Sequence, residues 1–162
     1  MAMLNTPPIG AALQTAMGII PAMSPRAIDR VREVEAKAAQ LPQVQIDVHH
    51  LLHGGMYART VTIPAGVMIT GALIKIPTIL SLSGHALVFV GDEIHDLCGE
   101  HVLACSANRK QAFHALADTR LTMIFPTQAR TVEEAESEFT DEVGLLTSQD
   151  GVTKNHAVAT GE

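Results

Sequence analysis

Histidine is the side chain in this sequence best suited to binding a transition metal, and the chain contains eight. Three of them, His49, His50 and His53, stand close together just before Gly54 and Gly55. Short histidine-rich tracts can bind metal. No carboxylate or cysteine stands at a ligand spacing beside them, however, and on a strand His49 and His50 would point to opposite faces. We therefore favour surface or packing roles for the three, with a metal site as the alternative.

Arg59 and His114 are the two candidates for contacting a small ligand. If residues 56–63 form a strand, Arg59 shares a face with Tyr57 and Val61. We expect Arg59 to pair with a carboxylate or to extend its head group toward water, with anion recognition as the alternative. His114 shares a strand face with Leu116 and could look into the interior. A lone histidine there is more often a hydrogen-bonded core or rim residue than a ligand.

The other reactive residues form no recognisable catalytic pattern. Cys98 and Cys105 have neither disulfide-framework nor metal-ligand spacing, and we expect two buried or half-buried thiols in a reducing compartment. The chain contains no phosphate-cradling glycine loop, nucleophile elbow or zinc-protease helix motif. The sequence therefore favours a protein that is not an enzyme, with enzymatic activity as the alternative.

The composition of the chain argues against nucleic acid and membranes as partners. The 162 residues suffice for one domain with extensions, and the 47% of hydrophobic residues argues against disorder. Aromatic residues make up only 3% and the net charge is −6, so we expect no nucleic-acid-binding face. No apolar run approaches the roughly 18 residues that span a membrane. The first 25 residues lack Lys and Arg, which argues against a secretory signal.

Period-two alternation in the middle of the chain predicts strands. Val61 and Ile63 alternate with threonines, and residues 64–66 (Pro-Ala-Gly) then form a turn. Similar short apolar runs recur to Phe125. The predicted strands cover residues 44–48, 56–63, 67–75, 78–82, 86–90, 93–97, 101–105, 110–116 and 120–125. Many short strands at near-regular spacing are typical of a small β-barrel.

Two predicted helices flank the strands. Ser24 and Pro25 suit an N-cap and a first helical position. Thr131 and Glu134 form a capping box that begins a second, acidic helix extending to about Phe139. The chain thus divides into an extended apolar arm (1–23), a helix (24–42), a β-barrel with its C-terminal helix (43–142) and a polar tail (143–162). The arm is either a loose terminus or orders on a neighbouring subunit.

An ordered set of motifs gives residues 26–142 a family resemblance. Tyr57-Ala58-Arg59 precedes Ile63-Pro64-Ala65-Gly66, and Ala115-Leu116-Ala117-Asp118-Thr119 follows near the end. This region resembles single-domain cupin-fold proteins, in particular those encoded by tailed bacteriophages. The resemblance implies a mainly β fold: a cupin-like jelly-roll β-barrel with an N-terminal helix and a short acidic C-terminal helix.

The resemblance also bears on whether the chain carries the metal site of metal-binding cupins. Metal-binding cupins carry two histidines and a glutamate on and after the strand that follows the Pro-Ala-Gly turn, and a third histidine on a later strand, because these side chains suit ions such as Fe, Mn and Zn. The corresponding residues 71–79 contain neither His nor Glu, and the later position falls near Leu116. We therefore expect no metal in that site and no cofactor.

A metal-free barrel with an apolar arm leads us to predict a non-catalytic structural or assembly protein, specifically a phage virion component of the head, neck or tail. We expect it to form homo-oligomers, to contact other virion proteins through the N-terminal arm, and to reside in the virion after synthesis in the host cytoplasm. Nucleic acid and membranes are not expected partners. The alternatives are a metal-dependent cupin enzyme, a small-molecule or sugar-binding cupin, or a regulatory protein whose barrel holds a ligand without chemistry.

Overall fold

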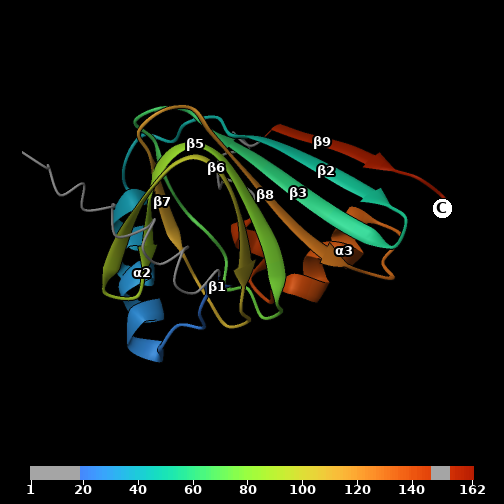
Figure 1. Ribbon diagram of the computed structural model, residues 1–162, viewed down its shortest axis with the longest axis horizontal. Helices are drawn as coiled ribbons and strands as arrows, with labels where there is room; N and C mark the ends of the chain where they lie inside the picture. The colour runs from blue at the N-terminus through green and yellow to red at the C-terminus, as the bar shows by residue number, and fades with distance from the viewer. Residues whose placement is uncertain (1–18, 147–153) are drawn as a thin grey trace, which may run out of the picture.

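Figure 1 shows the computed structural model, which describes residues 19–146 and 154–162. In these two stretches the chain is mainly β, with two helices. The strands are β1 (Ile19–Ile20), β2 (Asp47–His53), β3 (Met56–Ile63), β4 (Met68–Thr70), β5 (Thr78–Val90), β6 (Glu93–Cys105), β7 (Ala112–Ala115), β8 (Thr119–Pro126) and β9 (Lys154–Ala159). The helices are α2 (Pro25–Ala38) and α3 (Val132–Phe139), and η1 (Val143–Leu145) is a short 3₁₀ turn.

The strands form one mixed sheet that folds over on itself. Its main path runs β1-β6-β5-β8-β3-β2-β9, and β7 joins it at β5 and carries β4. The long strand β5 pairs with β8 through residues 79–83 and with β7 through residues 86–89, while β6 accompanies it throughout. Figure 1 shows the resulting arch of β5 and β6, which produces two layers. The sheet is not closed within the described residues, so the fold is an open sandwich where the sequence predicts a barrel.

Two facing glycines lie at the arch. Gly84 pairs with Gly99, and both have positive φ, 138° and 97°. A Cβ on Gly84 would lie 2.6 Å from the carbonyl oxygen of Asp118, so only glycine fits there. The predicted strands 78–82 and 86–90 are therefore one continuous 13-residue strand, and so are 93–97 and 101–105. The glycines bend the strands without interrupting their pairing.

Other predicted strands have different bounds. β2 covers residues 47–53 instead of 44–48, because it pairs with β3 all the way to the turn at residues 54–55. β4 and β7 are shorter than the predicted 67–75 and 110–116. Beyond them the backbone pairing is reduced to isolated bonds, such as the one from the Gly71 N–H to the Gln111 carbonyl oxygen (2.8 Å).

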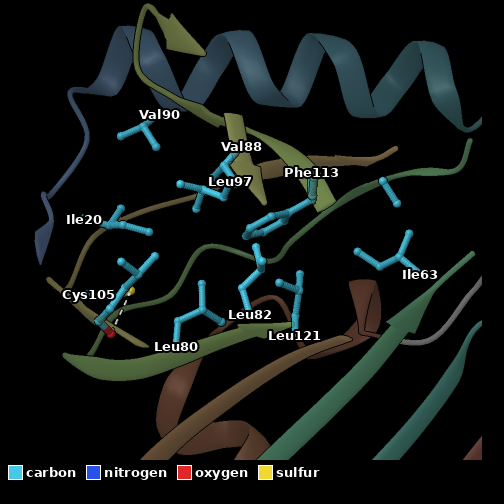
Figure 2. Packing of buried hydrophobic residues seen from close by; sticks show 13 residues of the cluster. Ile20, Ile63, Leu80, Leu82, Val88, Val90, Leu97, Cys105, Phe113 and Leu121 are labelled. Carbon is cyan, nitrogen blue, oxygen red and sulfur yellow. Dashed lines mark hydrogen bonds between the residues drawn. The ribbon is translucent and has the colours of Figure 1, made fainter. Parts of the chain in front are cut away.

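The main core lies between the two layers. Along β5 the even-numbered residues Leu80, Leu82, Ala86 and Val88 are buried, as expected for a strand with one face inward. Figure 2 shows this cluster, in which residues of β3, β6, β7 and β8 pack against β5 and Phe113 contributes an aromatic ring. The core therefore depends on close packing of aliphatic side chains.

Both predicted helices are present with the predicted caps. Ser24 Oγ accepts a hydrogen bond from the Ala27 N–H (3.2 Å), and Thr131 Oγ1 accepts one from the Glu134 N–H (3.2 Å). α2 ends at Ala38 rather than near residue 42, because the N–H groups of Gln40 and Leu41 bond to carbonyl oxygens only three residues back (3.1 and 3.0 Å).

The two ends differ from their predictions. The predicted polar tail (143–162) contains η1 and β9, and β9 pairs in parallel with β2. The polar composition of this segment did not predict a strand, because its pairing partner β2 lies about a hundred residues earlier in the sequence. At the end of the predicted arm, β1 pairs with β6, and Ile20 is only 2% exposed. Residues 1–18, the rest of that arm, lie outside the described residues.

No helix in residues 19–146 and 154–162 is long and apolar enough to cross a bilayer.

Candidate functional site

A cavity of about 650 Å³ extends from between the two layers to the end of α2 and the segment 41–46. Much of its wall is apolar, with contributions from β3, β4, β5, β7 and β8: Val61, Ile69, Leu80, Phe113, Leu121 and Met123. Leu41 and Val44, which are 63% and 47% exposed, line its outer part. Cavities of this volume and polarity suit small, mainly apolar ligands.

Arg59 reaches this cavity from β3. Its Nη1 donates to Glu136 Oε1 (2.7 Å) and its Nη2 donates to the Leu146 carbonyl oxygen (3.1 Å). Arg59 and Glu136 are both largely buried. The expected pairing of Arg59 with a carboxylate is thus confirmed, and its charge is balanced within the chain.

Arg109 also lines the cavity and is only 3% exposed. Its Nη1 donates to the carbonyl oxygens of Ser106 (2.5 Å) and Ile76 (3.4 Å), and its Nη2 donates to Thr78 Oγ1 (2.5 Å). Burial lowers its pKa below the usual value, but arginine remains charged in proteins. Within the described residues its polar partners are neutral and no carboxylate pairs with it.

Gln111 stands two residues beyond Arg109 in the same wall and is 6% exposed. Its amide Nε2 is buried and has no hydrogen-bond partner among the residues that the structure describes. A buried amide nitrogen without a partner is costly, and such groups are rare in folded proteins. Arg109 and Gln111 thus add to a mainly apolar wall a positive charge without a carboxylate partner and a buried amide nitrogen without a hydrogen-bond partner among the described residues.

A network of hydrogen-bonded side chains joins β9, β2 and β3 beside the cavity. His50 Nε2 lies 3.0 Å from Asn155 Oδ1, which can only accept, so this nitrogen carries the proton. In neutral His50, Nδ1 then accepts a hydrogen bond from the Tyr57 hydroxyl (2.8 Å). Burial lowers the pKa of His50 and raises that of Tyr57 to about 12. Both groups are therefore neutral at pH 7. We assign these hydrogen bonds a structural role, since they link three neighbouring strands.

Lys110 forms a second polar cluster under α2. Its fully buried Nζ lies 3.1 Å from Glu35 Oε1 and 3.0 Å from Glu142 Oε2. Burial opposes ionisation of Glu142, but hydrogen bonds from the Leu73 N–H and from Lys110 outweigh it and lower the pKa of this carboxyl. Thr70 Oγ1 also donates to Glu35 (3.1 Å). The cluster ties α2 and the segment after α3 to the sheet.

The three clustered histidines do not share a site. His49 is exposed and its ring stacks on that of His156, with centroids 4.5 Å apart. His50 is buried and hydrogen-bonded to Tyr57 and Asn155. His53 Nδ1 contacts Thr160 Oγ1 (2.8 Å). Within residues 19–146 and 154–162, no three His, Cys, Asp or Glu side chains are grouped so that they could hold a metal ion.

His114 is not brought together with Arg59. Phe113 and Ala115 occupy the buried positions of β7, and the half-buried His114 alternates with them and does not line the cavity. Its role as a ligand contact stays a prediction. Cys105 is buried and burial raises the pKa of its thiol, whereas Cys98 is exposed.

Arg109 and Gln111 were missed by the sequence reasoning, although a signal was present. The polar residues Arg109 and Gln111 precede Phe113 at intervals of two, a spacing that would place all three on one face of an extended segment. Recognising it requires knowing that this face borders a cavity, which only the fold establishes.

Comparison with known proteins finds similarity to solved structures at low sequence identity. The chain matches no protein-family model, and no curated protein matches it in sequence. A cupin superfamily protein from Desulfitobacterium hafniense shares 19% identity over 56% of this chain and 87% of its own, with a TM-score of 0.43. Ectoine synthase from P. lautus shares 18% over 61% of this chain and 76% of its own (TM-score 0.45). A variant of salicylate 1,2-dioxygenase from Pseudoaminobacter salicylatoxidans shares 14% over 70% of this chain and 36% of its own (TM-score 0.46).

Likeness at this level assigns neither a family nor an activity to the chain. The function must therefore be argued from its own residues.

The outer face of the sheet carries a second feature, an apolar row that crosses seven strands. The pairing register places these residues side by side: Val158, Leu51, Ala58, Ile124, Ile79, Ala104 and Ile19. Leu51, Ile79 and Val158 are each about half exposed, at 47%, 48% and 57%. Single exposed apolar residues are common, but a contiguous apolar patch often marks an interaction surface.

Proposed function

We propose that this protein is a non-catalytic binding protein that holds a small, mainly apolar ligand in the cavity between its two layers. The observation that carries the proposal is the cavity itself, about 650 Å³ in volume and walled by side chains such as Val61, Ile69 and Phe113. Transfer of apolar ligand surface from water into such a cavity supplies the binding free energy. The ionic groups Arg59 and Lys110 are already paired, so they are structural rather than reactive.

The test is binding of a neutral apolar fluorophore, 1-aminoanthracene, to the full chain. We expect micromolar affinity, and at least about tenfold weaker binding by Val61→Phe, which fills part of the cavity. Val102→Phe is the matched control, since Val102 is 73% exposed and does not line the cavity. Absence of binding to the native chain, or equal binding by Val61→Phe, would contradict the proposal.

The apolar row favours a second candidate function, assembly. We propose that the outer face packs on a further protein surface, as in a homo-oligomer or a phage virion component of the head, neck or tail made in the host cytoplasm. Support comes from the row of Leu51, Ile79 and Val158 and from the motif resemblance to phage-encoded cupin-fold proteins. Contacts of the N-terminal arm with other virion proteins belong to the same proposal.

Light scattering after size-exclusion chromatography tests the oligomer. We expect the native chain to elute as an oligomer and Ile79→Lys to elute as a monomer, because a charge in the row opposes burial of that face. Leu116→Lys, at a similarly exposed position outside the row, is the matched control. A native chain that stays monomeric at high concentration would remove the main support for assembly.

A further inference from the structure

The charged side chains of the cavity wall differ in whether a side chain of opposite charge pairs with them. Arg59 is paired with Glu136, and Glu35 is paired with Lys110. Arg109, in contrast, donates to two carbonyl oxygens and one hydroxyl, and no carboxylate among the described residues pairs with it. The Cys105 thiol influences the pKa of Arg109, but this buried thiol stays neutral because burial raises its own pKa. The described part of the wall therefore carries one uncompensated positive charge.

Arg109 also retains hydrogen-bonding capacity. Its three observed bonds use three of the five N–H groups of a guanidinium. Gln111, two residues beyond Arg109 and also part of the cavity lining, adds the buried Nε2 that has no partner among the described residues. Desolvated donors and an unbalanced charge are costly in a mainly apolar wall, and an anionic acceptor would relieve both costs.

We propose that the cavity ligand is an apolar monocarboxylate, whose carboxylate lies against Gln111 and Arg109 and whose hydrocarbon part lies along Val61, Ile69 and Leu121. This inference rests on the proposed ligand-binding function and specifies the chemical class of the ligand. A carboxylate fits because it only accepts hydrogen bonds and carries one negative charge, which complements the single uncompensated cation. A polyhydroxylated ligand such as a sugar fits poorly, because its many hydroxyls would face aliphatic side chains.

Titration calorimetry with two ligands of equal chain length tests the inference on the full chain. Octanoate carries the carboxylate, and octanol keeps the hydrocarbon and an oxygen acceptor but no charge. We expect octanoate to bind the native chain at least about tenfold more tightly than octanol, since hydrogen bonds to a charged group are about twice as strong as neutral ones. We expect Gln111→Leu to weaken octanoate binding about tenfold and to leave octanol binding unchanged.

Gln111→Leu has a similar volume and removes a buried unpartnered amide, so it is expected to fold. Gln128→Leu, the same substitution at an exposed position outside the cavity, is the matched control and should bind both ligands as the native chain does. Equal affinity for octanoate and octanol, or undiminished octanoate binding by Gln111→Leu, would overturn the carboxylate inference while leaving the ligand-binding function in place. Failure of both ligands and of 1-aminoanthracene to bind would overturn the function itself.

Discussion

Tyr57 is the single tyrosine of the chain, so its ionisation can be observed directly. It is fully buried, and burial raises its pKa from 10.0 to about 12, against the opposing influence of Arg59. We expect the tyrosinate absorbance of the folded protein to appear with a midpoint near pH 12, and that of the unfolded chain near pH 10. A midpoint near pH 10 under folding conditions would show that the hydroxyl is not buried in the folded protein.

The same shift affects stability at high pH. Because the folded pKa lies above the unfolded value, the contribution of Tyr57 is complete below pH 10 and is lost as the pH rises toward 12. The loss in the free energy of unfolding from this group is roughly 2–3 kcal/mol. Tyr57→Phe should remove this part of the pH dependence.

Lys110 shows how strongly one buried charge can depend on its partners. Lys110→Ala would leave Glu35 and Glu142 facing each other without the ammonium group between them. We expect urea denaturation to show a loss of about 3 kcal/mol in the free energy of unfolding, the usual cost of breaking a buried ion pair. Lys37→Ala, at an exposed position of α2, is the control and should change it by less than about 0.5 kcal/mol. Equal effects of the two substitutions would refute the structural role of the cluster.

At the scale of elements, the arch in β5 is the critical feature. Gly84→Ala places a Cβ within 2.8 Å of three atoms of Asp118 and Thr119, two of them backbone, at a φ of 138°. We expect a loss of at least about 3 kcal/mol in the free energy of unfolding, because strain and overpacking add. Gly91→Ala is the matched control: it also has positive φ but meets no atom within 4 Å, so it should cost about 1 kcal/mol. Similar melting temperatures for the two variants would mean that β5 can relax at the arch.

At the scale of the whole molecule, the distribution of ligating side chains bears on metal dependence. No three of them are grouped to hold an ion within residues 19–146 and 154–162. We expect untagged purified protein to contain no stoichiometric transition metal, and chelator to leave its Tm unchanged. A bound ion whose removal lowers the Tm would contradict this and would favour a metal-dependent activity.

The sequence by itself determined the features that depend on near neighbours. Both helix caps, at Ser24 and Thr131, were predictable because capping involves residues three positions apart. The inward face of β3, with Tyr57 and Arg59, followed from strand alternation alone.

Only the tertiary structure decided which distant segments meet. Strand β9 has no strong local signal and forms because β2 offers it an open edge. The continuity of β5 through Gly84 depends on β6 accompanying it with Gly99. The cavity likewise exists because β3 and β8 face β4 and β7 across the fold, which places Arg109 and Gln111 opposite aliphatic side chains. Local patterns specify which face of a segment is buried, but the partner of that face is set by long-range packing of the whole chain.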